Sequence, residues 1–156
     1  MSRLKALAAK CVSIIKKIDQ QNIPYAIEYK GMRKFNGEGI YDDYRTGSEF
    51  GLTCATFILA IFDSAGLNLL EWENWPVRSN DSVWFDELIR YIDTARARRW
   101  TVMSDEHYNN LKSEANCKKI RPEEVFSAVY SIASPQKFCC SEMIGPFVRS
   151  HVLGLA

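Results

Sequence analysis

The stretch GLTCATFILAIFDSAGLNLL, residues 51–70, places a glycine and a threonine shortly before a cysteine that opens an apolar helix. The pattern predicts a helix from about Cys54 to Ala65, closed by Gly66 as its C-cap. Apolar residues occupy nearly every face of this helix, which is typical of a central and buried element. We therefore expect Cys54 to stand at the end of a rigid element in the middle of the fold.

The position of Cys54 favours a role as a reactive thiol. The first turn of a helix has unpaired backbone N–H groups and the positive end of the helix dipole, so a thiolate there is stabilised. The same N–H groups can bind the oxyanion that forms when a thiol attacks an acyl group. Cys54 is therefore the predicted nucleophile of a cysteine hydrolase, and the alternative is a cysteine that packs as a small hydrophobe.

Length and composition indicate one globular domain. The chain has 156 residues, of which 47% are hydrophobic and 25% charged, and its formal net charge is +1. We predict a single domain over residues 1–156. Because so small a net charge creates no general field, we expect no nucleic-acid partner. The sequence leaves the oligomeric state open.

No segment has the pattern of a signal peptide or a membrane span. Residues 1–21 are basic and partly apolar but lack a continuous apolar core. The longest apolar run, residues 55–70, is interrupted by polar residues and is shorter than the ~20 residues of a span. Five cysteines without a regular framework fit a reducing compartment. We expect a soluble, cytoplasmic protein without a metal or cofactor.

Apolar spacing, capping residues and prolines predict the remaining elements. The predicted helices cover residues 3–19, a segment capped by Asn80 or Asp81, residues 105–115 capped by Ser104, a segment from Pro122, and a segment from Pro135 that is bent or broken at Gly145-Pro146. A short extended piece is expected at residues 22–29, and short strands are expected at 101–103 and 117–120. The glycine-rich residues 31–51 are predicted to form a long loop that leads to Cys54.

The general base has two candidates, because the chain contains only two histidines. His107 lies in the sequence SDEHYNN at the start of a predicted helix, with Asp105 and Glu106 beside it. We predict that His107 is the base, and the alternative is a capping or surface histidine. His151 lies near the end of the chain and is the weaker candidate.

Two further groups of residues are candidates for function. Trp75, Arg78 and Asp81 in the segment EWENWPVRSNDSVW are predicted to bind substrate, and the alternative is that they pack in the core and cap a helix. Cys139 and Cys140 in CCSEMI form a second thiol site. If Pro135 is the first helical residue, both lie in the second turn and are expected to pack into the core.

The segment GLTCATFILAIFDSAGLNLL, with the pieces WPVR, NDSVW and RPEEV, resembles bacterial proteins with papain-like, NlpC-type thiol hydrolase domains, particularly the circularly permuted branch and its uncharacterised relatives. The resemblance covers roughly residues 20–130. It implies a mostly helical α+β domain in which the nucleophilic cysteine starts a central helix packed on a small antiparallel sheet. It also implies Cys54 as nucleophile and amide or ester substrates, in small peptides, peptidoglycan fragments or acyl lipids.

The histidine departs from the pattern of that family. In the permuted branch the histidine lies on a strand upstream of the cysteine, and residues 1–53 contain none. Three alternatives remain: His107 serves in an altered arrangement, the domain is shortened and lacks the part with the base, or the chain is a catalytically inactive relative. The predicted function is a cysteine hydrolase, either an amidase or peptidase or a thiol acyl-hydrolase. The alternative is an inactive relative that acts as an interaction or binding module.

Overall fold

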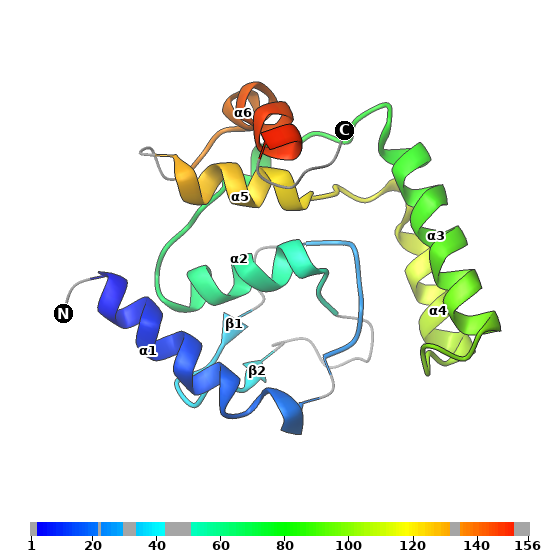
Figure 1. Cartoon of the computed structure of the whole chain (residues 1–156), viewed down its shortest axis with the longest axis horizontal. Coiled ribbons are helices and arrows are strands. Elements are labelled where there is room, and N and C mark those ends of the chain that lie inside the picture. The colour runs from blue at the N-terminus through cyan, green and yellow to red at the C-terminus, as the bar shows by residue number, and fades with distance from the viewer. Residues whose placement is uncertain (1–2, 22, 30–33, 43–50, 132–134, 152–156) are drawn as a thin grey trace.

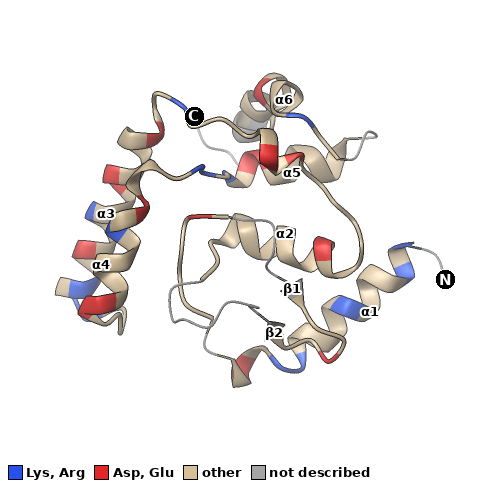
Figure 2. Cartoon of the chain, turned by 180° about the vertical axis from the view of Figure 1, so that it is seen from behind, with Lys and Arg blue, Asp and Glu red and all other residues tan. Residues whose placement is uncertain are grey.

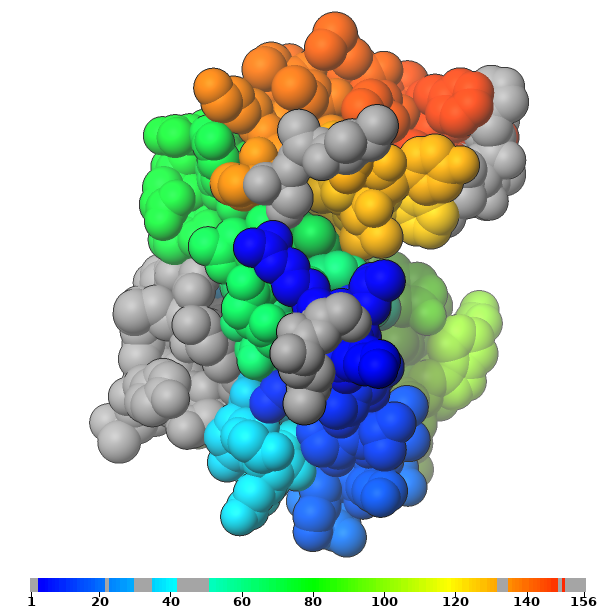
Figure 3. All heavy atoms as spheres, turned by 90° about the vertical axis from the view of Figure 1, so that its left-hand side faces the viewer, coloured from blue at the N-terminus to red at the C-terminus, as the bar shows by residue number. Residues whose placement is uncertain are grey.

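The computed structural model describes residues 3–21, 23–29, 34–42, 51–131 and 135–151 (Figure 1). Its helices are α1 Arg3–Ile15, α2 Cys54–Ser64, α3 Asp81–Ala97, α4 Asp105–Ser113, α5 Pro122–Tyr130 and α6 Phe138–His151, with short 3₁₀ turns at Ile18–Gln20, Trp72–Asn74 and Glu114–Asn116. In Figure 1, α2 lies in the middle, α1 below it, α5 and α6 above it, and the pair α3 and α4 to one side. Viewed from the side in Figure 3, α5 and α6 form the upper part of the molecule, above α1.

The predicted α+β, papain-like fold with a small antiparallel sheet is wrong, because the described part of the chain is helical. Its only paired strands are β1 Lys34–Phe35 and β2 Tyr41–Asp42, an antiparallel pair two residues long in which Phe35 faces Tyr41. This pair is far shorter than an ordinary strand pair, although Phe35 and Tyr41 pack in the cluster that contains Ala60 and Ile61 of α2. Within the described ranges, the expected pieces at 101–103 and 117–120 form no strand either.

The extended segment 23–29 shows why no sheet forms there. The amides of Ile27 and Glu28 both donate to the carboxylate of Glu114, at 2.6 and 3.1 Å. A side chain thus takes the place of a neighbouring strand. On the other side the segment meets the residues before α2, where the amide of Leu52 donates to the Pro24 carbonyl at 2.9 Å. A Cβ on Gly51 would lie 1.9 Å from that same carbonyl oxygen, so only glycine allows this close approach.

The predicted boundaries of α2 are confirmed. Thr53 is the N-cap, and it forms a capping box with Thr56 in which each side chain accepts the other's amide. At the other end Gly66 has a φ of +74° and its amide donates to the Asp63 carbonyl at 3.0 Å. This is a glycine-terminated helix of the kind that the sequence indicates.

The prediction that α2 is central is also confirmed. Two clusters of buried side chains meet on it: one contains Ala55 and Leu59 of α2 together with residues of α5, and the other contains Ala60 and Ile61 together with residues of α1 and β1. A third cluster lies between α3, α4 and Ile27. Figure 2 shows little charge on α2, in contrast to α3 and α4, which carry charged residues along their length.

The other predicted helices are found with shifted ends. The helix from residue 3 stops at Ile15, and Ser104 caps α4 as predicted by accepting the amide of His107 at 3.1 Å. The last helix begins at Phe138 instead of Pro135 and continues through Pro146. Of the predicted loop 31–51, residues 34–42 form a tight hairpin and most of the remainder lies outside the described residues. None of the described helices is both long and apolar enough to cross a membrane.

Candidate functional site

An apolar groove with a volume of about 370 Å³ runs between α2 and α5. Its walls are Cys54, Ala55, Ile58 and Phe62 from α2, and Pro122, Val125, Phe126 and Val129 from α5. None of these side chains is charged. The groove arises because α2 presents one stripe at four-residue spacing, Cys54, Ile58 and Phe62, toward the helix beside it. Cys54 supplies the only sulfur in this lining.

Cys54 is exposed and is the first residue of α2. The capping box uses the amide of Thr56, and within the described part of the chain the amides of Cys54 and Ala55 have no acceptor. Two N–H groups are therefore free beside the thiol at the positive end of the helix dipole. This arrangement can hold the oxyanion of an acyl group that the thiol attacks.

Tyr25 is a polar side chain whose pKa is affected by Cys54. Its pKa is raised to about 12, first by burial, then by repulsion from Cys54 and from Glu114. The phenol therefore keeps its proton at neutral pH and remains a hydrogen-bond donor. The sequence alone did not indicate Tyr25. Its position two residues ahead of Ile27, in an apolar segment behind a proline, gave no sign that it would lie near the cysteine.

His107 belongs to a different hollow. Its Nε2 lies 2.6 Å from the backbone carbonyl oxygen of Tyr25, and since a carbonyl only accepts, Nε2 carries the proton. This hollow, of about 420 Å³, is lined by residues 23–25, residues 101–104 and His107, and Cys54 is not among them. Among the described residues, no hydrogen bond joins His107 to Cys54. The structure thus joins His107 to the Tyr25 backbone and does not bring the predicted nucleophile and the predicted base together.

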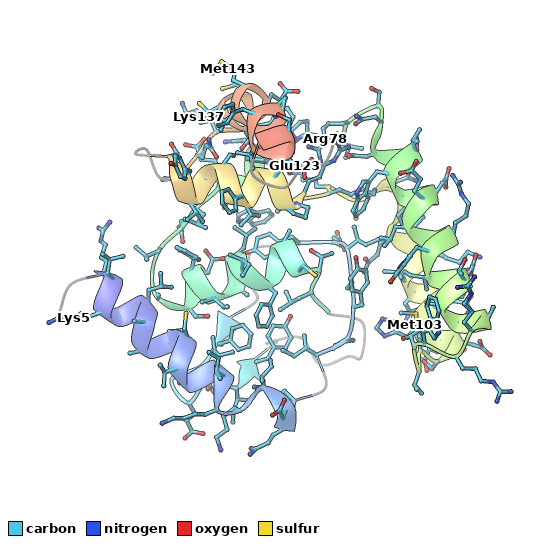
Figure 4. All side chains as sticks on the ribbon, in the orientation of Figure 1. Lys5, Arg78, Met103, Glu123, Lys137 and Met143 are labelled. Carbon is cyan, nitrogen blue, oxygen red and sulfur yellow. The ribbon has the colours of Figure 1, made fainter. Side chains whose placement is uncertain are left out.

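Trp75, Arg78 and Asp81 lie close together, and their polar groups form hydrogen bonds within the protein. The Trp75 side chain is 1% exposed, and its Nε1 donates to Glu124 at 3.3 Å. Arg78 donates to Asp81 at 3.1 Å, to Glu124, and to the Lys119 carbonyl at 2.7 Å. Figure 4 shows Arg78 close to the start of α5, where these groups meet. Their hydrogen-bonding capacity is used internally, which is what a structural cluster requires.

The charges of this cluster perturb both of its acids. Burial acts to raise the pKa of Asp81, but hydrogen bonds from the Arg78 amide and the Arg121 guanidinium outweigh it and lower the pKa. Burial raises the pKa of Glu124, although Arg78 opposes the shift. Asp81 is also held by Arg121 at 2.8 Å. The start of α3 is thereby fastened to the start of α5.

The second thiol pair is placed differently from its prediction. Because α6 begins at Phe138, Cys139 and Cys140 lie in the first turn of the helix, and Cys139 is exposed rather than packed in the core. The two Sγ atoms are 4.0 Å apart. The side chain of His151 lies outside the described part of the structure.

The comparisons with known proteins indicate no family and no fold for this chain. No family model, no curated protein and no solved structure matches the chain.

Proposed function

We propose that the protein is a thiol acyl-hydrolase in which Cys54 attacks an ester or thioester that carries an apolar acyl chain. The observation that supports this proposal most directly is the placing of an exposed thiol, with two free amides beside it, in the lining of an apolar groove. An apolar groove of this kind suits a hydrocarbon chain. It offers few polar atoms for the backbone of a peptide, so an acyl substrate is preferred over an amide or peptide.

The proposed reaction has two steps. In the first, the Cys54 sulfur forms a bond to the acyl carbon, the bond to the leaving oxygen or sulfur breaks, and the thiol proton goes to the leaving group. In the second, water attacks the thioester, the carbon–sulfur bond breaks, and the carboxylic acid leaves the regenerated thiol. The amides of Cys54 and Ala55 stabilise the oxyanion in both steps, and the protonated phenol of Tyr25 is a further donor.

The role of His107 in this proposal is to position Tyr25 through the backbone carbonyl. To act as the base, His107 would have to leave that carbonyl and turn toward Cys54. The first step can proceed from an activated ester without a dedicated base, whereas the second needs a base to activate water. We therefore expect acylation to be faster than deacylation, so that the acyl-enzyme accumulates.

The test uses p-nitrophenyl octanoate and the mass of the intact protein. We expect release of nitrophenolate together with a single octanoyl adduct on Cys54, located by peptide mapping. Cys54→Ser should lose the adduct, and Cys139→Ser should retain it, since Cys139 is an equally exposed thiol away from the groove. An adduct that appears first on Cys139, or none on Cys54, would show that the proposal is wrong.

An interaction module without catalysis is the second candidate function. It is favoured by the fact that His107 donates to Tyr25 and not to Cys54. In this case the groove between α2 and α5 would receive an apolar segment of a partner. The tryptophan-bearing segment is not suited to this role, because Trp75 is buried and Arg78 is bound internally. Absence of the Cys54 adduct, with the groove intact, would favour this second function.

A further inference from the structure

The start of α6 carries three sulfur-containing side chains that the proposed hydrolase does not use. Cys139 is exposed, Cys140 is half-buried, and their Sγ atoms are 4.0 Å apart. Met143 follows one helical turn later and is 75% exposed. In Figure 4 the side chain of Met143 points away from α5, toward solvent.

The separation of the two thiols has a geometric consequence. A metal ion bound to both sulfurs at about 2.3 Å, the length of a metal–thiolate bond in zinc sites, would subtend an angle of about 120° at a sulfur separation of 4.0 Å. That angle belongs to a trigonal centre and not to a linear one. A trigonal centre has room for a third ligand.

Met143 is placed to be that ligand. It lies four residues after Cys139 and three after Cys140, and residues at both spacings are neighbours on the surface of a helix. Its side chain is long and flexible, so the thioether can move to a metal without a change in the backbone. Leucine or isoleucine at this exposed position would leave the two thiols without a third soft donor.

We propose that Cys139, Cys140 and Met143 form a binding site for one Cu(I) ion. Thiolate and thioether sulfurs are the soft ligands that select Cu(I). A structural zinc site needs four ligands, and among the described residues no three His, Cys, Asp or Glu side chains are grouped to hold a metal. Two thiolates and one Cu(I) carry a net charge of −1, which the positive start of α6 and the adjacent Lys137 offset.

Binding involves no change of oxidation state. Two copper–sulfur bonds form to the cysteines, the two thiol protons go to the buffer, and the thioether sulfur donates a lone pair as the third ligand. The site lies on α6, apart from the groove between α2 and α5, so it does not depend on the function proposed for Cys54.

The test titrates the reduced full-length protein with Cu(I) under anaerobic conditions, in competition with the chromogenic chelator bathocuproine disulfonate. Native mass spectrometry supplies the stoichiometry. We expect one Cu(I) per chain. Cys139→Ser removes a ligand and should weaken binding more than the roughly 10–100-fold that outer-shell changes cost. Met143→Leu should weaken it about tenfold.

Two matched controls separate this site from other sulfurs of the chain. Met103→Leu removes a thioether elsewhere, and Cys54→Ser removes the other exposed thiol outside the pair. Both should bind Cu(I) as the unsubstituted protein does. The proposal is overturned if Cys139→Ser and Met143→Leu retain full affinity, or if Cys54→Ser loses it. Circular dichroism of each variant checks that α6 is retained.

Discussion

The buried face of α5 contains polar side chains, whereas its exposed face toward the groove is apolar. Its buried side contains, beside the apolar Val125 and Ala128, two polar side chains, Glu124 at 5% and Ser127 at 0% exposed. The face toward the groove contains apolar side chains, Phe126 at 39% and Val129 at 50% exposed. An ordinary surface helix has the opposite pattern, with polar residues toward water.

The face of α5 that is available to a ligand is the one toward the groove. On the buried face, Glu124 is hydrogen-bonded by Arg78 and Trp75, and the Ser127 hydroxyl lies within hydrogen-bond distance of a backbone carbonyl and of Gln136 Oε1, so most of the polar groups bind one another, although the buried Gln136 Nε2 has no partner among the described residues. On the groove face, apolar surface stays in contact with water, and its removal from water is favourable. A polar cluster whose bonds are satisfied stabilises a fold, whereas an uncovered apolar groove favours binding.

The largest effect is expected on the buried face. Arg78→Ala would leave the buried carboxylate of Glu124 without its main cation, and the Lys119 carbonyl without a donor. Removing one partner of a buried ion pair costs about 3–5 kcal/mol. Urea unfolding at pH 7 should show a loss of this size, and Arg90→Ala, which removes an exposed arginine of α3, should change stability by less than about 0.5 kcal/mol.

The same variant has a pH signature. Because burial raises the pKa of Glu124, removal of the opposing Arg78 should raise it further, and acid then neutralises the stranded carboxylate. The cost of Arg78→Ala should therefore be smaller at pH 5 than at pH 7. An equal cost at both pH values would mean that the buried face is held by packing alone.

The next effect concerns Tyr25, which lines the hollow that contains His107. Its pKa is 10.0 in an unfolded chain and about 12 in the fold, so between these values the native state binds more protons than the unfolded state. Stability is therefore fully present below pH 10 and falls as the pH rises toward 12. With a discount for partial exposure, the fall is about 2 kcal/mol.

Tyr25→Phe removes this titration, so a comparison with the unsubstituted protein separates it from the titrations of the other tyrosines. The difference in unfolding free energy between the two proteins should grow from pH 9 to pH 11.5, with the phenylalanine variant losing less. A constant difference over that range would contradict the placing of the phenol in a buried position near Cys54.

A smaller effect is expected on the groove face. Phe126→Ala shortens one wall, so octanoyl transfer to Cys54 should slow about tenfold, whereas acetyl transfer, which does not reach this wall, should change little. Phe147→Ala removes an aromatic side chain that is exposed on α6 outside the groove and is the matched control. If both acyl chains respond equally, the groove does not hold the substrate chain.

The helices could be predicted because their signals are local. Thr53 before Cys54, Gly66 after the helix, Ser104 before α4 and Pro122 at the start of α5 each satisfy or remove specific backbone groups at a helix end. The absence of the predicted sheet, in contrast, could not be foreseen from the sequence. Whether segment 23–29 pairs with a strand depends on Glu114, which is far away in the chain and takes its amides.

The candidate site could be predicted only in part. The position of Cys54 at the start of α2 follows from the sequence, whereas the groove depends on α5, which lies beside α2 only in the fold. Tyr25 and His107 meet through a backbone carbonyl, which leaves no pattern in the sequence. Trp75, Arg78 and Asp81 were predicted to bind substrate, with core packing and helix capping as the alternative, and the sequence could not reveal that Glu124 and Lys119 complete their hydrogen bonds from α5 and the segment before it.

The smallest effect compares one residue from each face of α5. Ser127→Ala removes a buried hydroxyl that lies 2.8 Å from the Glu124 carbonyl oxygen and 3.0 Å from Gln136 Oε1 and donates to one of them at a time. Since Ser141 still donates to the same Gln136 oxygen at 3.1 Å, no acceptor on that side chain loses every partner, and the cost should be only about 1 kcal/mol. Val129→Ala truncates a half-exposed side chain on the groove face and should cost less than about 0.5 kcal/mol. Thermal unfolding of the two variants, measured side by side, would show the ranking. A larger loss for Val129→Ala would mean that the groove is closed and packed in solution, because only a buried valine contributes that much.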